Sequence, residues 1–226
     1  MTEAHPAPAG AADATDAAAA CRAHWDQVYA SKAMDAVSWH QSRPETSLRL
    51  IDMAGLGPGA AIVDVGGGRS LLVDALLERG DLRITVLDVS PVAIRAARER
   101  LGPRAAQVAW MVADVRSPEI AALGEGSLHC WHDRAVFHFL VEPAERQAYL
   151  AALRRSLRPD GAVVMATFAE DGPPRCSNLP VARWSAAGLA RELGDAFELL
   201  HDERELHGTP WGAVQPFTWC LFRRRR

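Results

Sequence analysis

A glycine-rich turn between an apolar stretch and an expected helix constrains this chain more than any other feature. The run Ile62–Leu72 is IVDVGGGRSLL, so an expected strand contains one acid and is followed at once by three glycines. Glycine permits a tight turn and lets a ligand approach the main chain closely. The first N–H groups of the helix that follows have no partner within it. The pattern predicts a ligand site at the end of this strand.

A second acid follows at the distance expected of a nucleotide-binding unit. The apolar stretch Ile84–Leu87 ends at Asp88, which lies 22 residues beyond Gly66. In βαβ units that bind nucleotides, an acid about 20 residues after the glycine loop contacts the ribose hydroxyls. The two features together predict a site for an adenosine-like ligand.

Small departures from the dinucleotide pattern indicate which ligand this is. A dinucleotide loop needs a third small residue, and here that position holds the bulky Leu71. Asp64 precedes the glycines and would repel a pyrophosphate, whereas it suits a cationic amino group. S-adenosylmethionine carries such a group and has no phosphate. A nicotinamide-dependent oxidoreductase remains an alternative, disfavoured by these two residues.

The stretch Asp64–Ser70 resembles the first motif of the class I S-adenosylmethionine-dependent methyltransferases, Asp/Glu-x-Gly-x-Gly-x-Gly, with serine in the last place. This resemblance implies S-adenosylmethionine as the cofactor, with ribose and adenine contacts after the next two strands. The implied cofactor-binding residues of this part of the chain are Asp64, Gly66, Gly68, Asp88, Val89, Asp114 and Val115. Here Asp114 would accept from the adenine amino group.

Aromatic residues upstream of the loop resemble one branch of this class, the elongation-factor and citrate-synthase lysine methyltransferases. In that branch the residues matching Trp25, Tyr29 and Trp39 enclose the methionine end of the cofactor. An aromatic wall suits a sulfonium because of cation–π attraction. Packing of a helix onto the sheet is the alternative interpretation, and for Trp25 and Tyr29 the two are evenly balanced.

The segment after the expected fourth strand, Leu128–Trp131, is the candidate for chemistry. We expect His132 as a general base and Asp133 as a second catalytic residue that also contacts the cofactor. A structural role for His132 is an equal alternative, and neighbours on an extended segment point apart. Arg134 is suited to an anionic group on the cofactor or the acceptor. Two Gly/Pro-containing loops, 171–183 and 207–215, are candidates for the acceptor side.

The remaining chain alternates expected strands and helices, which predicts an α/β fold. We expect a helix over Pro143–Arg158, a turn at 158–161 and a strand over Ala162–Phe168. The resemblance implies a Rossmann-like, doubly wound seven-stranded sheet, mostly parallel with an antiparallel last strand. Residues 21–226 would form this domain, and the Ala- and Pro-rich residues 1–20 a disordered tail.

Composition limits the partners and the location. The net charge of −3 gives no electrostatic footprint for nucleic acid. The four cysteines lack metal-ligand spacing, so we expect no metal and reduced thiols. We identify no secretory signal and no membrane span, which indicates a cytoplasmic protein.

The sequence therefore predicts an S-adenosylmethionine-dependent methyltransferase whose acceptor, a small molecule or a protein lysine, is unassigned. A non-catalytic S-adenosylmethionine-binding partner or sensor is the other alternative. The oligomeric state stays open.

Overall fold

A seven-stranded sheet with the strand order β3-β2-β1-β4-β5-β9-β8 forms the centre of the structure. The structure is a computed structural model that describes residues 10–226, with side chains from residue 18 onward. The strands of this sheet are β1 (Ala61–Val65), β2 (Arg83–Asp88), β3 (Val108–Val112), β4 (Leu128–Arg134), β5 (Leu157–Phe168), β8 (Phe197–Gly208) and β9 (Val214–Arg224). A separate hairpin consists of β6 (Arg175–Cys176) and β7 (Leu179–Pro180).

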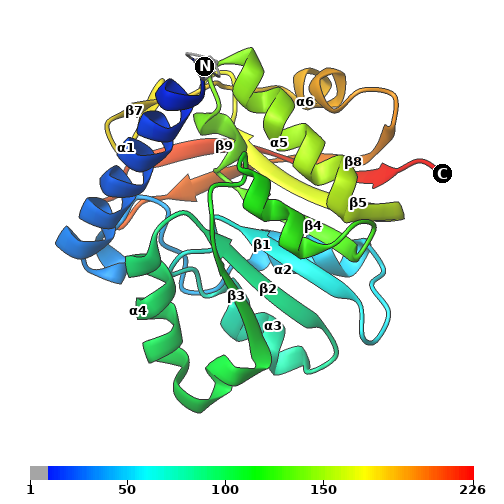
Figure 1. Cartoon of the computed structure of the whole chain (residues 1–226), viewed down its shortest axis with the longest axis horizontal. Helices are drawn as coiled ribbons and strands as arrows, with labels where there is room; N and C mark the ends of the chain where they lie inside the picture. Colours follow the sequence, from blue (N-terminus) through cyan, green and yellow to red (C-terminus); the bar gives the residue numbers. More distant parts are fainter. Residues whose placement is uncertain (1–9) are drawn as a thin grey trace, which may run out of the picture.

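Helices cover both faces of the sheet (Figure 1). The α-helices are α1 (Gly10–Ser31), α2 (Glu45–Met53), α3 (Leu72–Arg79), α4 (Pro91–Leu101), α5 (Pro143–Ser156) and α6 (Ala186–Leu193). Short 3₁₀ helices are η1 (Met34–Ala36), η2 (Gly102–Gln107), η3 (Pro118–Leu123) and η4 (Phe137–Phe139). Across residues 10–226, no helix has the length and apolar character needed to cross a bilayer.

The strand directions confirm the predicted fold class. Neighbouring strands from β3 to β5 run parallel, and β9 runs antiparallel to both β5 and β8. The order of the strands reverses between β1 and β4. In open α/β sheets, ligands bind at such a switch point, outside the carboxyl ends of the strands.

Alternation along the central strands divides the core into two layers. Ile62 packs with residues of α2, α3 and α4, and its neighbour Val63 packs with residues of α5 and α6. Successive side chains of a strand point to opposite faces, so a sheet covered on both sides needs apolar residues at nearly every position. The continuous apolar strands of the sequence follow from this architecture.

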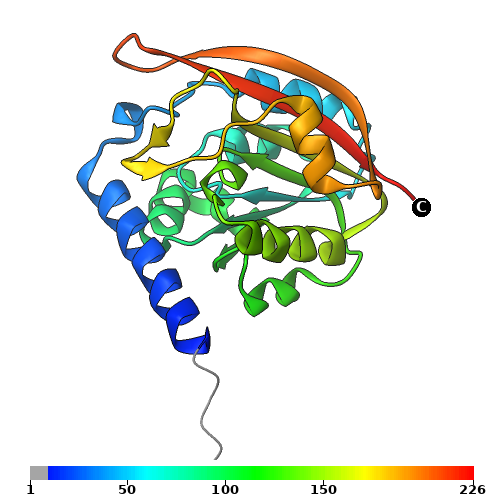
Figure 2. The same ribbon diagram turned by 90° about the horizontal axis from the view of Figure 1, so that it is seen from above.

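The N-terminal helix corrects one prediction. Helix α1 begins at Gly10, so residues 10–20 are helical where a disordered tail was expected. The many alanines of this stretch favour a helix. Residues 1–9 of the expected tail lie outside the described residues. Helix α1 runs beside α4 (Figures 1 and 2). Asp26 of α1 accepts a hydrogen bond from the hydroxyl of Ser90, which caps α4 by accepting from Ala93.

Two element boundaries also differ from the prediction. Strand β4 continues to Arg134, three residues beyond its expected end, because it pairs with β5 up to Ala166. Strand β5 begins at Leu157, so the expected turn lies inside the strand as an irregularity, with Asp160 at a φ of 61°. The segment His132–Arg134 is therefore part of the sheet, which decides the direction of its side chains.

Candidate cofactor and acceptor site

One cavity of about 360 Å³ lies at the carboxyl ends of the central strands. Small-molecule sites in proteins are roughly 300–1,000 Å³. Residues after β1, β2, β3 and β4 form its floor, and α1 with the segment around Trp39 forms one wall. The β6–β7 hairpin contributes Cys176 and Leu179, and Gln215 comes from the start of β9. Figure 2 shows the short hairpin near the chain that follows α1. Both loops expected on the acceptor side thus reach the cavity.

The glycine loop has little space for side chains. Gly66 and Gly68 have φ angles of 63° and 47°, a region that favours glycine. A Cβ on Gly66, which lines the cavity, would lie 2.1 Å from a methyl group of Val136. A Cβ on Gly68 would lie 2.5 Å from the hydroxyl of Tyr29. Both positions therefore require glycine, as the sequence motif implied.

Asp88 is the buried acid of the cavity. Its side chain is 5% exposed, and Oδ1 accepts a hydrogen bond of 2.8 Å from the N–H of Ser90. Burial raises the pKa of Asp88 to about 7, and the charges of Asp64 and Asp26 add to this effect. A carboxylate in such surroundings is stabilised by hydroxyl donors, which ribose supplies. Val89, the next residue, also lines the cavity.

Asp64 and His132 lie beneath the loop and not on the cavity wall. Asp64 Oδ1 is 2.7 Å from His132 Nδ1, and His132 Nε2 is 3.0 Å from the hydroxyl of Ser47. These three side chains are at most 3% exposed. Hydrogen bonds link the side chains of Ser47, His132 and Asp64 in that order, but none of the three lines the cavity. Both ring nitrogens of His132 are engaged, which corrects the expectation of a general base. Asp64 supports the loop from below.

Asp133 is also bonded to neighbouring groups inside the core. Its carboxylate accepts hydrogen bonds from the N–H groups of Val136 and Phe137 and, at 2.6 Å, from the hydroxyl of Tyr149. The side chain is fully buried, and burial raises its pKa to about 6. Asp133 is absent from the cavity wall, so the expected contact with the cofactor and the catalytic role are corrected. It holds in place the turn that carries Val136 to the cavity.

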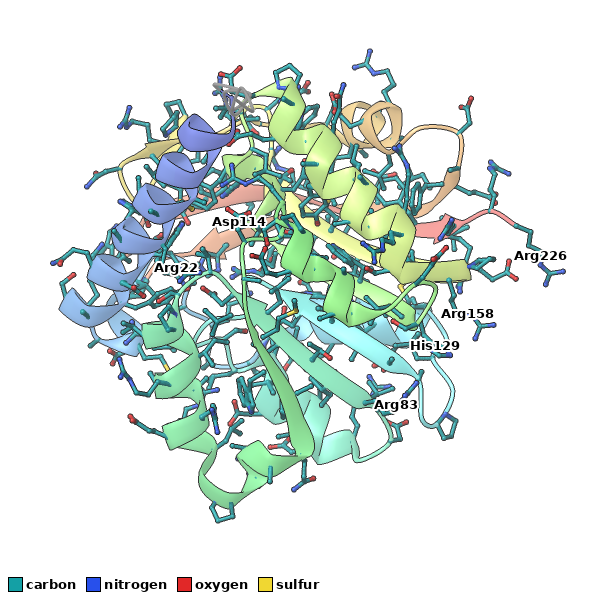
Figure 3. The ribbon with its side chains drawn as sticks, in the orientation of Figure 1. Arg22, Arg83, Asp114, His129, Arg158 and Arg226 are labelled. Carbon is teal, nitrogen blue, oxygen red and sulfur yellow. The ribbon has the colours of Figure 1, made fainter. Side chains whose placement is uncertain are left out.

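The residues that follow β3, expected to contact adenine, are only partly as predicted. Val115 lines the cavity together with Ala113 and Arg116, but the carboxylate of Asp114 does not. Asp114 is bonded to Arg116 at 2.6 and 2.9 Å. Burial acts to raise the pKa of Asp114, but the hydrogen bonds from Arg116 hold it below its usual value. Figure 3 shows Asp114 on the side of the sheet where Arg22 projects from α1. Its contact with adenine stays a prediction.

The three predicted aromatic residues come together at the cavity. Trp25, Tyr29 and Trp39 all line it. They also contact one another, with ring centroids 6.0 Å apart for Trp25 and Trp39 and 6.3 Å apart for Tyr29 and Trp39. Trp25 in addition packs edge-on against Phe139 at 5.1 Å. Packing and an aromatic wall are therefore the same arrangement in this fold, and the two interpretations do not compete.

The half of the cavity beyond β4 combines residues expected from the sequence, such as Trp39 and Arg134, with residues that sequence reasoning missed, such as Phe168 and Phe217. It is lined by Trp39, Arg134, His138, Phe139, Phe168, Cys176 and Phe217. Phe168 and Phe217 are paired residues of β5 and β9, and no local motif marks them. Ala135, which follows Arg134, has a φ of 71°, an uncommon angle for a residue with a side chain. The available signal was its position directly after a central strand, where ligands bind.

Two further sets of groups have no evident chemical role: the thiols on the cavity wall, and the charged side chains at the opposite ends of the strands. Burial raises the pKa of Cys21 and of Cys176, which keeps these cavity thiols protonated. Within the described part of the chain, no group of three or more His, Cys, Asp or Glu side chains is placed to hold a metal ion. Arg83, His129 and Arg158 are at the amino ends of their strands, opposite the cavity (Figure 3).

The fold and this site favour one kind of ligand. A sheet of this order, with a glycine loop after β1 and a buried acid after β2, is suited to an adenosine-containing cofactor with a second chamber beside it. Residues 62–161 match a protein family model described as a methyltransferase domain. The matched stretch contains the glycine loop, Asp88 and Asp114, and it spans less than half of the chain.

One curated relative agrees over a short stretch. The ribosomal protein L11 methyltransferase of Symbiobacterium thermophilum is 35% identical over 69 residues, which are 30% of this chain and 21% of that protein. The match thus spans about a fifth of that relative. It does not confirm the elongation-factor and citrate-synthase lysine methyltransferase branch.

Solved structures share the fold along most of the chain. A protein studied for the conversion of a disulfide bond into a thioacetal group during echinomycin biosynthesis has a TM-score of 0.73 at 22% identity, over 90% of this chain and 93% of that one. A 1,6-didemethyltoxoflavin-N1-methyltransferase of Burkholderia thailandensis, with 1,6-didemethyltoxoflavin and S-adenosylhomocysteine bound, has a TM-score of 0.65 at 21% identity, over 100% and 94%. A methyltransferase of Anabaena variabilis has a TM-score of 0.72 at 17% identity, over 92% and 95%.

Proposed function

We propose that this chain transfers the methyl group of S-adenosylmethionine to a small-molecule acceptor. The observation that carries the proposal is that one cavity is lined both by Gly66 and Asp88 and by Phe168 and Phe217 of β5 and β9, whose part of the cavity we call the second chamber. Helix α1 and the β6–β7 hairpin wall this chamber. A walled chamber favours a small acceptor over a folded protein surface. The toxoflavin-precursor methyltransferase with the same fold acts on a small molecule, which agrees with the proposal.

The residues present fit the cofactor. Gly66 would let it approach the main chain, Asp88 would accept from its ribose hydroxyls, and the aromatic wall of Trp25 and Trp39 would face its sulfonium. S-adenosylmethionine supplies a methyl group on a positively charged sulfur. The protein's part is alignment of the acceptor with that methyl, which is worth as much as about 7–11 kcal/mol.

His138, the histidine on the cavity wall beside Arg134, is a poor base. Burial lowers the pKa of His138 to about 3, helped by the nearby Arg134, so its imidazole holds a further proton poorly. The acceptor therefore arrives with a lone pair that is available at neutral pH. Alignment without acid–base machinery suits the in-line displacement of a methyl group from sulfur.

The test uses two experiments on the whole chain. In a thermal-shift titration, S-adenosylhomocysteine should stabilise the protein and NAD should not. Stabilisation by NAD alone would favour the oxidoreductase. S-adenosylmethionine with a labelled methyl group is then offered to the small-molecule and protein fractions of a lysate, with Asp88→Ala as the control variant. Label in the small-molecule fraction is expected. Label confined to protein would overturn the small-molecule acceptor, and binding without any transfer would favour a sensor.

A further inference from the structure

Arg134 is a half-buried cation on the cavity wall. It is the last residue of β4, and its Nη1 donates a 2.9 Å hydrogen bond to the carbonyl of Trp39. Its Nε and Nη2 are buried and have no hydrogen-bond partner among the described residues. No carboxylate of the described side chains lies within 4.0 Å of it. Burial lowers its pKa to about 10, so the guanidinium stays charged at neutral pH.

The acids nearest to Arg134 are bonded to other groups. The Glu205 carboxylate accepts hydrogen bonds from Gln41 and Trp219. Asp64 is paired with His132. Both acids raise the pKa of Arg134 from a distance without contacting it. A buried charge without a partner is costly, and an anion that reaches it recovers part of that cost.

The other polar group beside Arg134 is also a donor. His138 Nδ1 accepts from the N–H of Phe168 at 3.4 Å, so in the neutral ring the proton is on Nε2. That Nε2 is buried and has no partner among the described residues. The surroundings are aromatic, with the Arg134 guanidinium carbon 5.2 Å from the ring centre of Phe217. The chamber thus combines N–H donors with flat apolar walls.

We infer that the methyl acceptor is an acidic small molecule, with an apolar body against the aromatic walls and an anionic oxygen group on Arg134. Two oxygens of a carboxylate or phosphate match the free Nε and Nη2 in a bidentate pair. The inference rests on the proposed function and names its substrate class. It also disfavours a lysine acceptor, because a guanidinium repels an ammonium group.

The carboxylate of the cofactor is the competing partner for Arg134. Arg134 belongs to β4, which is two strand intervals from the β2 strand of Asp88, or about 10 Å at roughly 4.8 Å per interval, and its guanidinium extends toward Phe217 of β9. The carboxyl carbon of S-adenosylmethionine is about six bonds of roughly 1.5 Å from its ribose ring, which span less than about 9 Å. With its ribose on Asp88, the cofactor extends toward β4, and the aromatic walls on β5 and β9 are left to the acceptor. The comparison of S-adenosylhomocysteine with 5′-methylthioadenosine separates the two partners of Arg134.

The test measures binding of simple acids to the complex with S-adenosylhomocysteine. Benzoate and phenyl phosphate are the anionic probes, benzamide is the neutral one, and calorimetry at saturating S-adenosylhomocysteine gives the affinities. We expect at least one acid to bind about tenfold tighter than benzamide, and Arg134→Gln to abolish this preference. Arg134→Lys keeps a charge and should keep part of the preference. Arg83→Gln, at the opposite end of the sheet, should change nothing.

Each other outcome identifies which idea fails. Equal affinity for acids and benzamide in the unaltered protein, or no acid binding, overturns the acidic acceptor while the proposed function stands. Loss of S-adenosylhomocysteine affinity in Arg134→Gln, with 5′-methylthioadenosine binding unchanged, assigns Arg134 to the cofactor's carboxylate and also overturns it. Failure of the unaltered protein to bind S-adenosylhomocysteine removes the proposed function itself.

Discussion

The buried carboxyl of Asp88 predicts that cofactor affinity depends on pH. Its pKa in the free protein is about 7, because burial opposes its charge. Ribose hydroxyls donate to the charged form, so binding lowers this pKa and releases a proton in the window below pH 7. Affinity is therefore nearly full at pH 8 and falls as the pH falls through about 7. At pH 6 about one molecule in ten is ionised, which predicts a roughly tenfold loss of affinity between pH 8 and pH 6.

Calorimetric titration of S-adenosylhomocysteine at several pH values measures this window. Asp88→Asn is the matched variant, and it should bind about 1.5–3 kcal/mol more weakly at pH 8 without the extra slope. The amino group of the ligand contributes equally to the titrations of both proteins. The difference between the two curves therefore belongs to Asp88. An identical pH slope in the variant would refute the assignment of Asp88 to the ribose.

Three further predictions concern the loop and the buried polar residues. Gly68→Ala should weaken S-adenosylhomocysteine binding at least about tenfold in calorimetry, since its Cβ would meet Tyr29. Gly80→Ala has a similar positive φ with open space around it, so affinity should be retained, and equal losses would contradict the steric argument. His132→Gln should lower the melting temperature but leave the shape of the kcat pH profile unchanged; loss of an acidic limb would restore the general base. Asp133→Asn should cost about 1.5–3 kcal/mol in urea unfolding, with S-adenosylhomocysteine affinity within about threefold, and a larger affinity loss would indicate cofactor contact.

The part of the cavity around the glycine loop was predictable because its signals are local. Gly66, Gly68 and Asp88 are placed by one strand, one turn and the next strand, so their spacing in sequence fixes their spacing in the fold. Trp25 and Trp39 were placed correctly at the cavity, although their sequence pattern alone left packing as an equal interpretation. Helix α1 was missed at its start because an Ala-rich stretch without a clear apolar stripe gives a weak pattern.

The acceptor half was not predictable in the same way. Arg134, Phe168 and Phe217 come from three strands, and the strand order that brings them together is a property of the whole sheet. Cys176 is carried to the cavity by a hairpin whose two central residues have positive φ angles of 47° and 64°. A two-residue turn of this kind matches the twist of its strands, but its sequence, Ser-Asn, is a weak turn signal. The pairing of strands in the sheet, and not the spacing of residues in the sequence, brings these residues together.

The errors at His132 and Asp133 have one physical cause, which also explains why Arg134 faces the site. Polar residues after an apolar run favour a loop, but pairing with β5 keeps all three in the strand. Alternation then sends Asp133 to the layer of α5, where Tyr149 donates to it, and His132 to the layer of α2, where it contacts Ser47. Arg134 points to the same face of the sheet as His132, but it lies two residues nearer the carboxyl end of β4 and so reaches the cavity. In β4 only the residue at the tip faces the cavity, and the polar residues below it have partners inside the core.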